Sequence, residues 1–136
     1  MRQFKDMHGR EYNIILTLRT FKKFRDVLGI DMLTFSDQQM IDLSEDPIRM
    51  IDMIYVAIRE QCDAANITDT QFGESLQSEE ATAAVMAFFR AYADFCPRVK
   101  RDALNKYLDA AEAMQAKQEA AMETLLSGDT STDSQD

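Results

Sequence analysis

The sequence DPIRMIDMIYVAIREQCDAAN at residues 46–66 predicts the helix around which the rest of the chain is organised. Asp46 is a favourable N-cap, because its carboxylate can accept hydrogen bonds from the free N–H groups of a first helical turn. Pro47 follows at the first helical position, where its missing N–H costs nothing. Apolar residues cover roughly 220° of this helix at about 100° per residue, so we expect other elements to surround it.

Residues 3–16 are typical of a β-hairpin. Residues 6–9, DMHG, supply the turn, and Gly9 can take the positive φ that a tight turn requires. A lone two-stranded hairpin is marginal in water, so its apolar face must lie on the helices or pair with another chain. That face carries Phe4, Tyr12, Ile14 and Leu16.

A first helix is predicted to begin at Thr17 or Thr20. It ends at Gly29, which fits the left-handed C′ position and lets Ile30 fold back on the last turn. The residues expected to face inward are Leu18, Phe21, Phe24, Val27 and Leu28.

Three more helices accompany the helix at 46–66 before residue 97. Capping-box patterns at residues 36–39 and 68–71 each start a short helix. A longer helix starts at Ser78 and stops before Pro97, because a residue that precedes proline is pushed away from helical geometry. Its predicted inward residues are Ala81, Ala84, Val85, Phe88, Phe89, Tyr92 and Phe95.

The last helix is predicted over residues 98–127, a region rich in helix-forming Ala, Glu, Gln and Lys. Gly128 should end it, and residues 128–136 should form a disordered acidic tail because they contain no apolar residue. A seven-residue alternation predicts one contact seam along the helix, formed by Leu104, Tyr107, Ala111, Met114, Gln118, Ala121 and Leu125.

Together these patterns predict a mainly α (α+β) fold. A small N-terminal β-hairpin packs on a compact multi-helix domain over residues 1–97, and the long helix 98–127 follows it. Core filling is the favoured interpretation of Met50, Met53 and Met86, whereas partner contact is favoured for methionines of the last helix, Met114 and Met122.

Composition and charge limit the classes of partner. The 136 residues carry a net charge of -9, with +4 in residues 1–28 and therefore -13 in the remainder. Nucleic acid is disfavoured, because phosphate binding needs clustered Lys and Arg. No apolar run approaches the roughly 20 residues that span a membrane. The N-terminus lacks the apolar centre of a signal peptide, and Cys62 and Cys96 are expected as buried free thiols, so we expect a cytoplasmic protein.

No pattern in the sequence indicates an enzyme, a cofactor or a metal site. His8 is the one histidine and falls in the predicted hairpin turn, whereas a catalytic histidine needs an orienting carboxylate. Zinc sites need several closely spaced Cys or His ligands. Residues 42–46, DLSED, lack the ligand spacing of a calcium loop, and the four glycines form no phosphate-binding loop.

Five landmarks in a fixed order give the chain a family resemblance. They are residues 6–12 (DMHGREY), 28–33 (LGIDML), 46–47 (DP), 67–72 (ITDTQF) and 94–98 (DFCPR). In this order and spacing the sequence resembles the tail assembly chaperones of tailed bacteriophages and prophages. The resemblance covers about residues 3–105 and excludes most of the last helix.

This resemblance implies a non-enzymatic assembly factor in the cytoplasm of the host cell. Proteins of that family bind the phage tape measure protein, keep it soluble and help tail tube protein to assemble around it. We expect a client helix, or another copy in a homo-oligomer, to contact the last helix along the predicted seam. The hypothetical partner-binding residues are Leu104, Tyr107, Ala111, Met114 and Leu125.

Two other functions remain open from the sequence. A permanent part of the phage particle, such as a head–tail connector or adaptor subunit, is the main alternative. A helix-turn-helix regulator is the weaker one, because the short helices at residues 37–43 and 69–76 are acidic where a recognition helix should be basic.

Overall fold

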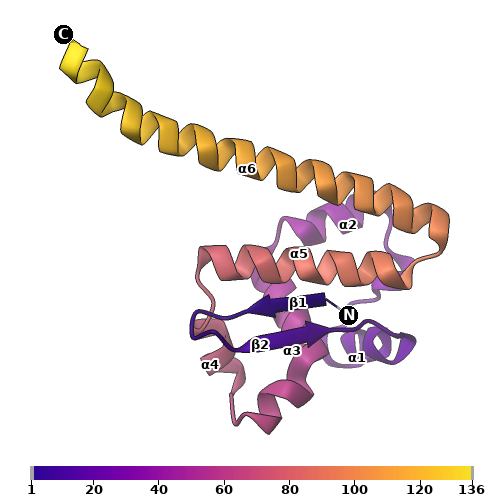
Figure 1. Ribbon diagram of the computed structural model, residues 1–136. Coiled ribbons are helices and arrows are strands. Elements are labelled where there is room, and N and C mark those ends of the chain that lie inside the picture. Colours follow the sequence, from indigo (N-terminus) through magenta and orange to yellow (C-terminus); the bar gives the residue numbers. More distant parts are fainter. Residues whose placement is uncertain (1, 136) are drawn as a thin grey trace.

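A computed structural model describes the backbone of residues 2–135 and the side chains of residues 2–127. It confirms the mainly α fold with an N-terminal hairpin and a long last helix (Figure 1). The elements, in chain order, are β1 (Arg2–Lys5), β2 (Glu11–Ile14), α1 (Leu18–Leu28), the 3-10 helix η1 (Met32–Thr34), α2 (Asp37–Ser44), α3 (Pro47–Ala64), α4 (Asp69–Glu74), α5 (Ser78–Phe95) and α6 (Arg98–Gln135).

The hairpin lies on the helices of its own chain. Its strands are antiparallel with Phe4 opposite Tyr12, and Gly9 in the turn has a φ of 80°. The whole apolar face predicted for it is buried, and β1 packs along α5 while β2 also contacts α3. Gln61 of α3 pairs with the backbone of Asn13 through both amide atoms, at 2.9 and 2.8 Å. These two hydrogen bonds satisfy part of the β2 edge that would otherwise be open.

The predicted helix ends are confirmed at most boundaries. Ser36 with Gln39 and Thr68 with Gln71 form the two capping boxes, and the Asp46 carboxylate accepts the Arg49 N–H at 3.1 Å. Those short-range signals depend on a few neighbouring residues, which is why the sequence reveals them.

The first helix begins at the N-cap Thr17 and ends at Gly29, whose φ of 68° is left-handed. The Ile30 N–H donates to the carbonyl of Phe24, and Ile30 is buried, as expected. The inward placement of Leu18 and Val27 was wrong, because both side chains are exposed. Only the Phe21 and Phe24 side of this short helix packs on the core, so its buried face is narrower than its apolar face.

The helix predicted at residues 46–66 is surrounded by other elements as expected, because α3 contacts α1, α2, α4, α5 and β2. Its first turn is open on one side, where Ile48 is 77% exposed. A second helix, α5, is enclosed as well, since β1, β2, α3 and α6 all pack against it (Figure 1). Its buried residues are Ala84, Ala87, Phe88, Phe89, Ala91, Tyr92 and Ala93.

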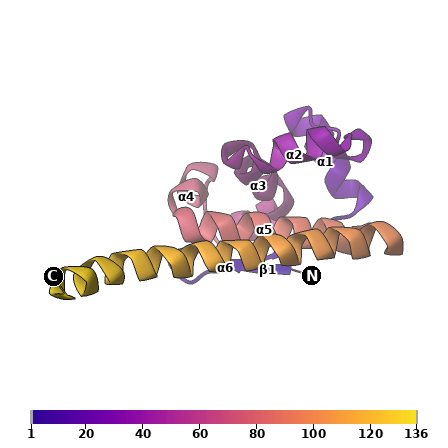
Figure 2. The same cartoon turned by 90° about the horizontal axis from the view of Figure 1, so that it is seen from above.

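The last helix leaves the body of the molecule partway along its length. Its first turns lie along α5, and its C-terminal half extends past the other elements (Figures 1 and 2). The helical backbone continues through Gly128 to Gln135, because a glycine inside a helix costs only about 1 kcal/mol relative to alanine. The side chains of residues 128–136 lie outside the described part of the chain, so the disordered tail stays a prediction.

Phe72 provides a test of how strongly the hairpin is held. Its buried ring lies 5.5 Å from Tyr12, 5.8 Å from Tyr55 and 6.3 Å from Phe4, measured between ring centroids. We expect Phe72→Ala to lower the free energy of unfolding by about 3–5 kcal/mol, because it leaves a cavity under the hairpin. Urea denaturation measures the loss. The exposed Leu18→Ala should change stability by less than about 0.5 kcal/mol, and equal losses would contradict this packing.

Candidate partner-binding surface

An apolar groove of about 390 Å³ runs between α2, α5 and α6. We call it the α2/α6 groove. Its polar groups are Asp37 and Ser44 of α2 and the hydroxyl of Tyr107, and the rest of its lining is hydrocarbon or thioether. All three helices contribute large side chains to the lining, including Met40 and Ile41 of α2, Met86 and Phe89 of α5, and Leu104 and Tyr107 of α6.

The structure brings only part of the predicted contact seam to this groove. Leu104, Tyr107 and Ala111 line it. Met114 and Leu125 are not among its lining residues; they lie farther along α6 and are each 63% exposed. The five predicted partner-binding residues therefore belong to two surfaces, the groove and the free side of α6.

Sequence reasoning missed Leu108 of α6, which is buried. The packed face follows Leu104, Leu108, Ala111 and Gln115, whereas Tyr107 is mostly exposed. A straight helix repeats every 3.6 residues, so a strict seven-residue alternation drifts off the packed face. A spacing of four, seven and eleven residues from Leu104, which is typical of one face of a straight helix, would have identified Leu108 as part of the packed face.

Arg90 of α5 holds α6 against α5 and is not among the residues that line the groove. Its guanidinium donates to Asn105 Oδ1 at 3.1 Å, to Asp109 Oδ1 at 2.6 Å and to Glu112 Oε1 at 3.1 Å. The Arg90 side chain is 16% exposed, whereas its two acidic partners lie at the surface. Because these contacts span two turns of α6, they set its direction across α5.

The first turn of α6 is held separately, at the sharp connection after Pro97. Lys100 donates to the hydroxyl of Tyr92 at 3.0 Å and its ammonium lies 5.4 Å from the centroid of the same ring. Arg101 donates to the carbonyl of Cys96 at 3.1 Å. The groove is therefore bounded by a helix that is fixed at its start and again at Arg90.

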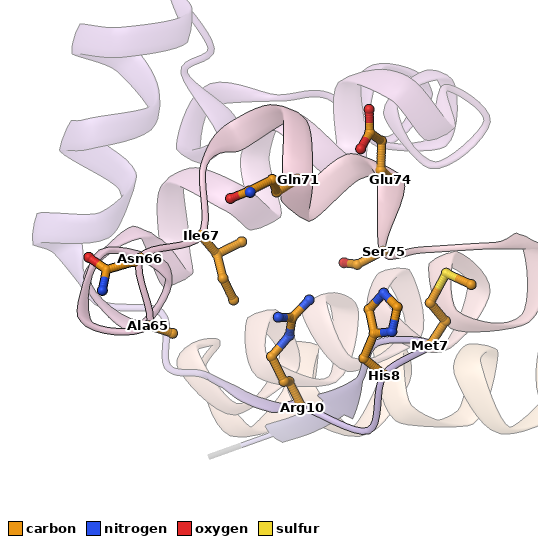
Figure 3. Close-up of a pocket in the computed structure, with 9 residues that line it drawn as sticks. All are labelled: Met7, His8, Arg10, Ala65, Asn66, Ile67, Gln71, Glu74 and Ser75. Carbon is orange, nitrogen blue, oxygen red and sulfur yellow. The ribbon is translucent and has the colours of Figure 1, made fainter.

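A second cavity, of about 450 Å³, lies between the hairpin turn and α4. Figure 3 shows Arg10 and His8 pointing from the turn toward α4, which carries Gln71 and Glu74. This lining is mixed and polar, with an acidic and a basic group but no paired nucleophile and base. It gives no geometry from which a reaction can be derived.

The wall of this second cavity depends on Asp6, a buried carboxylate in the hairpin turn. It accepts hydrogen bonds from the N–H of His8 at 2.9 Å, the N–H of Arg10 at 3.0 Å, the Arg10 guanidinium at 2.7 Å and the Tyr12 hydroxyl at 3.3 Å. Burial alone would raise the pKa of Asp6, but the hydrogen bonds from Arg10 and His8 outweigh it and hold that pKa below its ordinary value.

The cysteines offer no reactive thiol in this structure. Cys62 and Cys96 are both free and buried. Burial raises the pKa of Cys62 to about 11, so its thiol stays protonated at neutral pH. Across residues 2–127, no group of three or more His, Cys, Asp or Glu side chains is placed to hold a metal ion.

No protein-family model matches the chain, and neither a curated protein nor a solved structure gives a match. In the part of the chain that the structure describes, none of the helices combines the length and the hydropathy needed to cross a membrane. The surfaces that bear on function are therefore the α2/α6 groove and the exposed side of α6.

Asp6 predicts how stability depends on pH. Its folded-state pKa is lowered, so the carboxylate stabilises the fold above its unfolded pKa and loses this effect as the pH falls through the folded pKa. We expect Asp6→Asn to lower the free energy of unfolding by about 1.5–3 kcal/mol at pH 7. The gap between variant and wild type should narrow as the pH falls from about 5 to about 2.

Urea denaturation at a series of pH values measures this gap. Asp52→Asn, on an exposed side of α3, is the matched control and should change stability little at any pH. A gap that stays constant on acidification would contradict the role assigned to the Asp6 carboxylate.

Arg90 predicts how firmly α6 is held. Arg90→Ala removes three hydrogen bonds to α6, two of them to surface carboxylates, so we expect a loss of about 1–2 kcal/mol. Backbone amides of residues 101–112 should exchange with solvent about tenfold faster, measured by hydrogen–deuterium exchange. Arg59→Ala, which loses only an exposed ion pair to Asp63, is the control. Unchanged exchange in both variants would show that Arg90 does not hold α6.

Proposed function

We propose that the protein is a non-catalytic phage tail assembly chaperone that binds the tape measure protein and assists assembly of the tail tube. The observation that carries the proposal is the α2/α6 groove, an open apolar surface on an acidic helical protein. The ordered landmarks of the sequence, which resemble this chaperone family, support the same function. The site of action is the cytoplasm of the host cell.

The groove suits an amphipathic helix. Helix-in-groove recognition needs an apolar channel that receives side chains spaced three or four residues apart along a partner helix. Ile41 is 45% exposed and Tyr107 is 65% exposed, on opposite walls of the groove, so a partner can reach both. The tape measure protein is a long helical client, which is the kind of partner that this surface fits.

The methionines of the groove support a tolerant interaction. Met40 and Met86 line it from two different helices. Methionine is unbranched and polarizable, so it adapts to side chains of different shape. A chaperone that covers successive stretches of one long client needs such a surface more than it needs a single exact fit.

The charge of the protein supports the solubilising part of the role. A net charge of -9 on 136 residues favours dispersion of the chaperone and of a client that it coats. Tail tube protein is a second proposed partner, through the same assembly role. The acidic balance disfavours nucleic acid as a partner.

The test is co-expression with the tape measure protein encoded in the same genome. We expect the wild-type chaperone to keep the client in the soluble fraction and to co-purify with it. Ile41→Asp should reduce the recovered client at least tenfold, because it places a charge at an apolar contact worth about 1.4 kcal/mol or more. Ile48→Asp, the same substitution at an exposed site outside the groove, should leave recovery unchanged.

Two results would overturn the proposal. One is a wild-type protein that neither co-purifies with the tape measure protein nor keeps it soluble. The other is the presence of the protein in purified particles at a fixed stoichiometry, measured by mass spectrometry, which would favour the head–tail connector subunit instead.

A further inference from the structure

The free side of α6 carries a second apolar surface that shares only Tyr107 with the groove. We call it the α6 stripe. All its residues are exposed, including the three large ones, Tyr107 at 65%, Met114 at 63% and Leu125 at 63%. The C-terminal half of the helix extends past the other elements, which leaves room along this side (Figures 1 and 2). The stripe consists of Ala103, Tyr107, Ala110, Met114, Gln118, Ala121 and Leu125.

The stripe is symmetric about Met114. Its other members lie four, seven and eleven residues before Met114 and the same numbers of residues after it. Those separations keep residues on one face of a helix. Two copies of the stripe, placed antiparallel with Met114 against Met114, therefore bring every member opposite another member.

The opposed residues in that register are complementary in size. The pairs are Ala110 with Gln118, Tyr107 with Ala121, and Ala103 with Leu125. Each pair sets an alanine against a larger side chain, which lets two helices approach closely while the larger side chain fills the space. At about 1.5 Å per residue, the contact from Ala103 to Leu125 is about 33 Å long.

The charges of α6 favour the same antiparallel direction. Residues 98–106 carry four basic side chains and one acidic one, whereas residues 109–123 carry four acidic side chains and one basic one. In an antiparallel pair centred on Met114, residues 98–106 of one helix lie opposite residues 122–130 of the other, which contain acidic but no basic side chains, and only residues 109–119 lie opposite their own copy. A parallel pair would place like charges side by side and would lose this attraction.

We infer that the α6 stripe is an interface between two copies of this chain, which pair antiparallel with their two-fold axis at Met114. A two-fold interface is made by the same patch on both copies, and the stripe is complementary to itself. Since one helix pair forms the contact, we expect a dimer that dissociates in the micromolar range. The inference concerns a surface outside the α2/α6 groove lining except at Tyr107, and it does not depend on the proposed function.

Single cysteine variants test the register. Cys62 and Cys96 are buried, so an added surface cysteine is the accessible thiol among the described residues. Met114→Cys should form an intermolecular disulfide with its own copy under mild oxidation, seen on a non-reducing gel. Ala103→Cys and Leu125→Cys should each fail alone and cross-link when mixed. Ala116→Cys, about 200° around the helix from Met114, is the control and should not cross-link.

The association state gives a second, independent measurement. Sedimentation should give a mass approaching twice 15.6 kDa as the concentration rises. Met114→Glu should remain monomeric, because two carboxylates would meet at the axis, and its helix content should be unchanged. Met7→Glu, at a partly exposed methionine of the hairpin turn, should dimerise as the wild type does.

A wild-type chain that stays monomeric at all concentrations would overturn the inference. Self-cross-linking of Leu125→Cys alone would also overturn it, because it indicates a parallel pair. Neither result bears on the Ile41→Asp recovery experiment, so failure of the dimer and failure of the chaperone function are distinguishable.

Discussion

The packing of β1 and α6 against two sides of α5 is the constraint on which the rest of the structure depends. On the hairpin side, Ala87 and Ala91 are buried. Arg2 of β1 forms a bidentate ion pair with Asp94, with its guanidinium nitrogens 2.9 and 3.0 Å from the two carboxylate oxygens. Small side chains let a strand approach a helix closely, and a two-stranded sheet needs such cover to persist. On the other side, Arg90 directs α6 along the helix. One helix thus stabilises the hairpin and positions the groove.

Much of this fold was accessible from the sequence, because its signals are local. Capping boxes, the glycine at 29 and the alternation of the hairpin each depend on a few adjacent residues, and each was confirmed. The full enclosure of α5 was not accessible, because the buried Ala87, Ala91 and Ala93 look neutral in a pattern of hydropathy. Whether an alanine-rich face is a surface or a close contact depends on which element approaches it, and that is a tertiary property.

The same limit explains why the predicted contact seam divides between the groove and the free side of α6. An alternation of seven residues selected Leu104 and Ala111, which reach the groove, and passed over Leu108, which is buried against it. A helix that packs straight along one neighbour follows 3.6 residues per turn, whereas a seven-residue seam assumes a supercoiled partner. Met114 and Leu125 of that seam lie outside the groove lining and stay exposed.

The two faces of α6 differ in a way that separates their roles. The face toward α5 is joined by charged hydrogen bonds to Arg90 and by a buried leucine, so it has a partner within the chain. The free face combines three exposed large side chains with alanines. Apolar surface of this kind is unfavourable in water, and the small alanines allow a second helix to approach closely. Long exposed apolar side chains on a projecting helix favour association over the monomer. The body of the domain therefore stabilises the first half of α6, and the second half gains its own burial only from another helix.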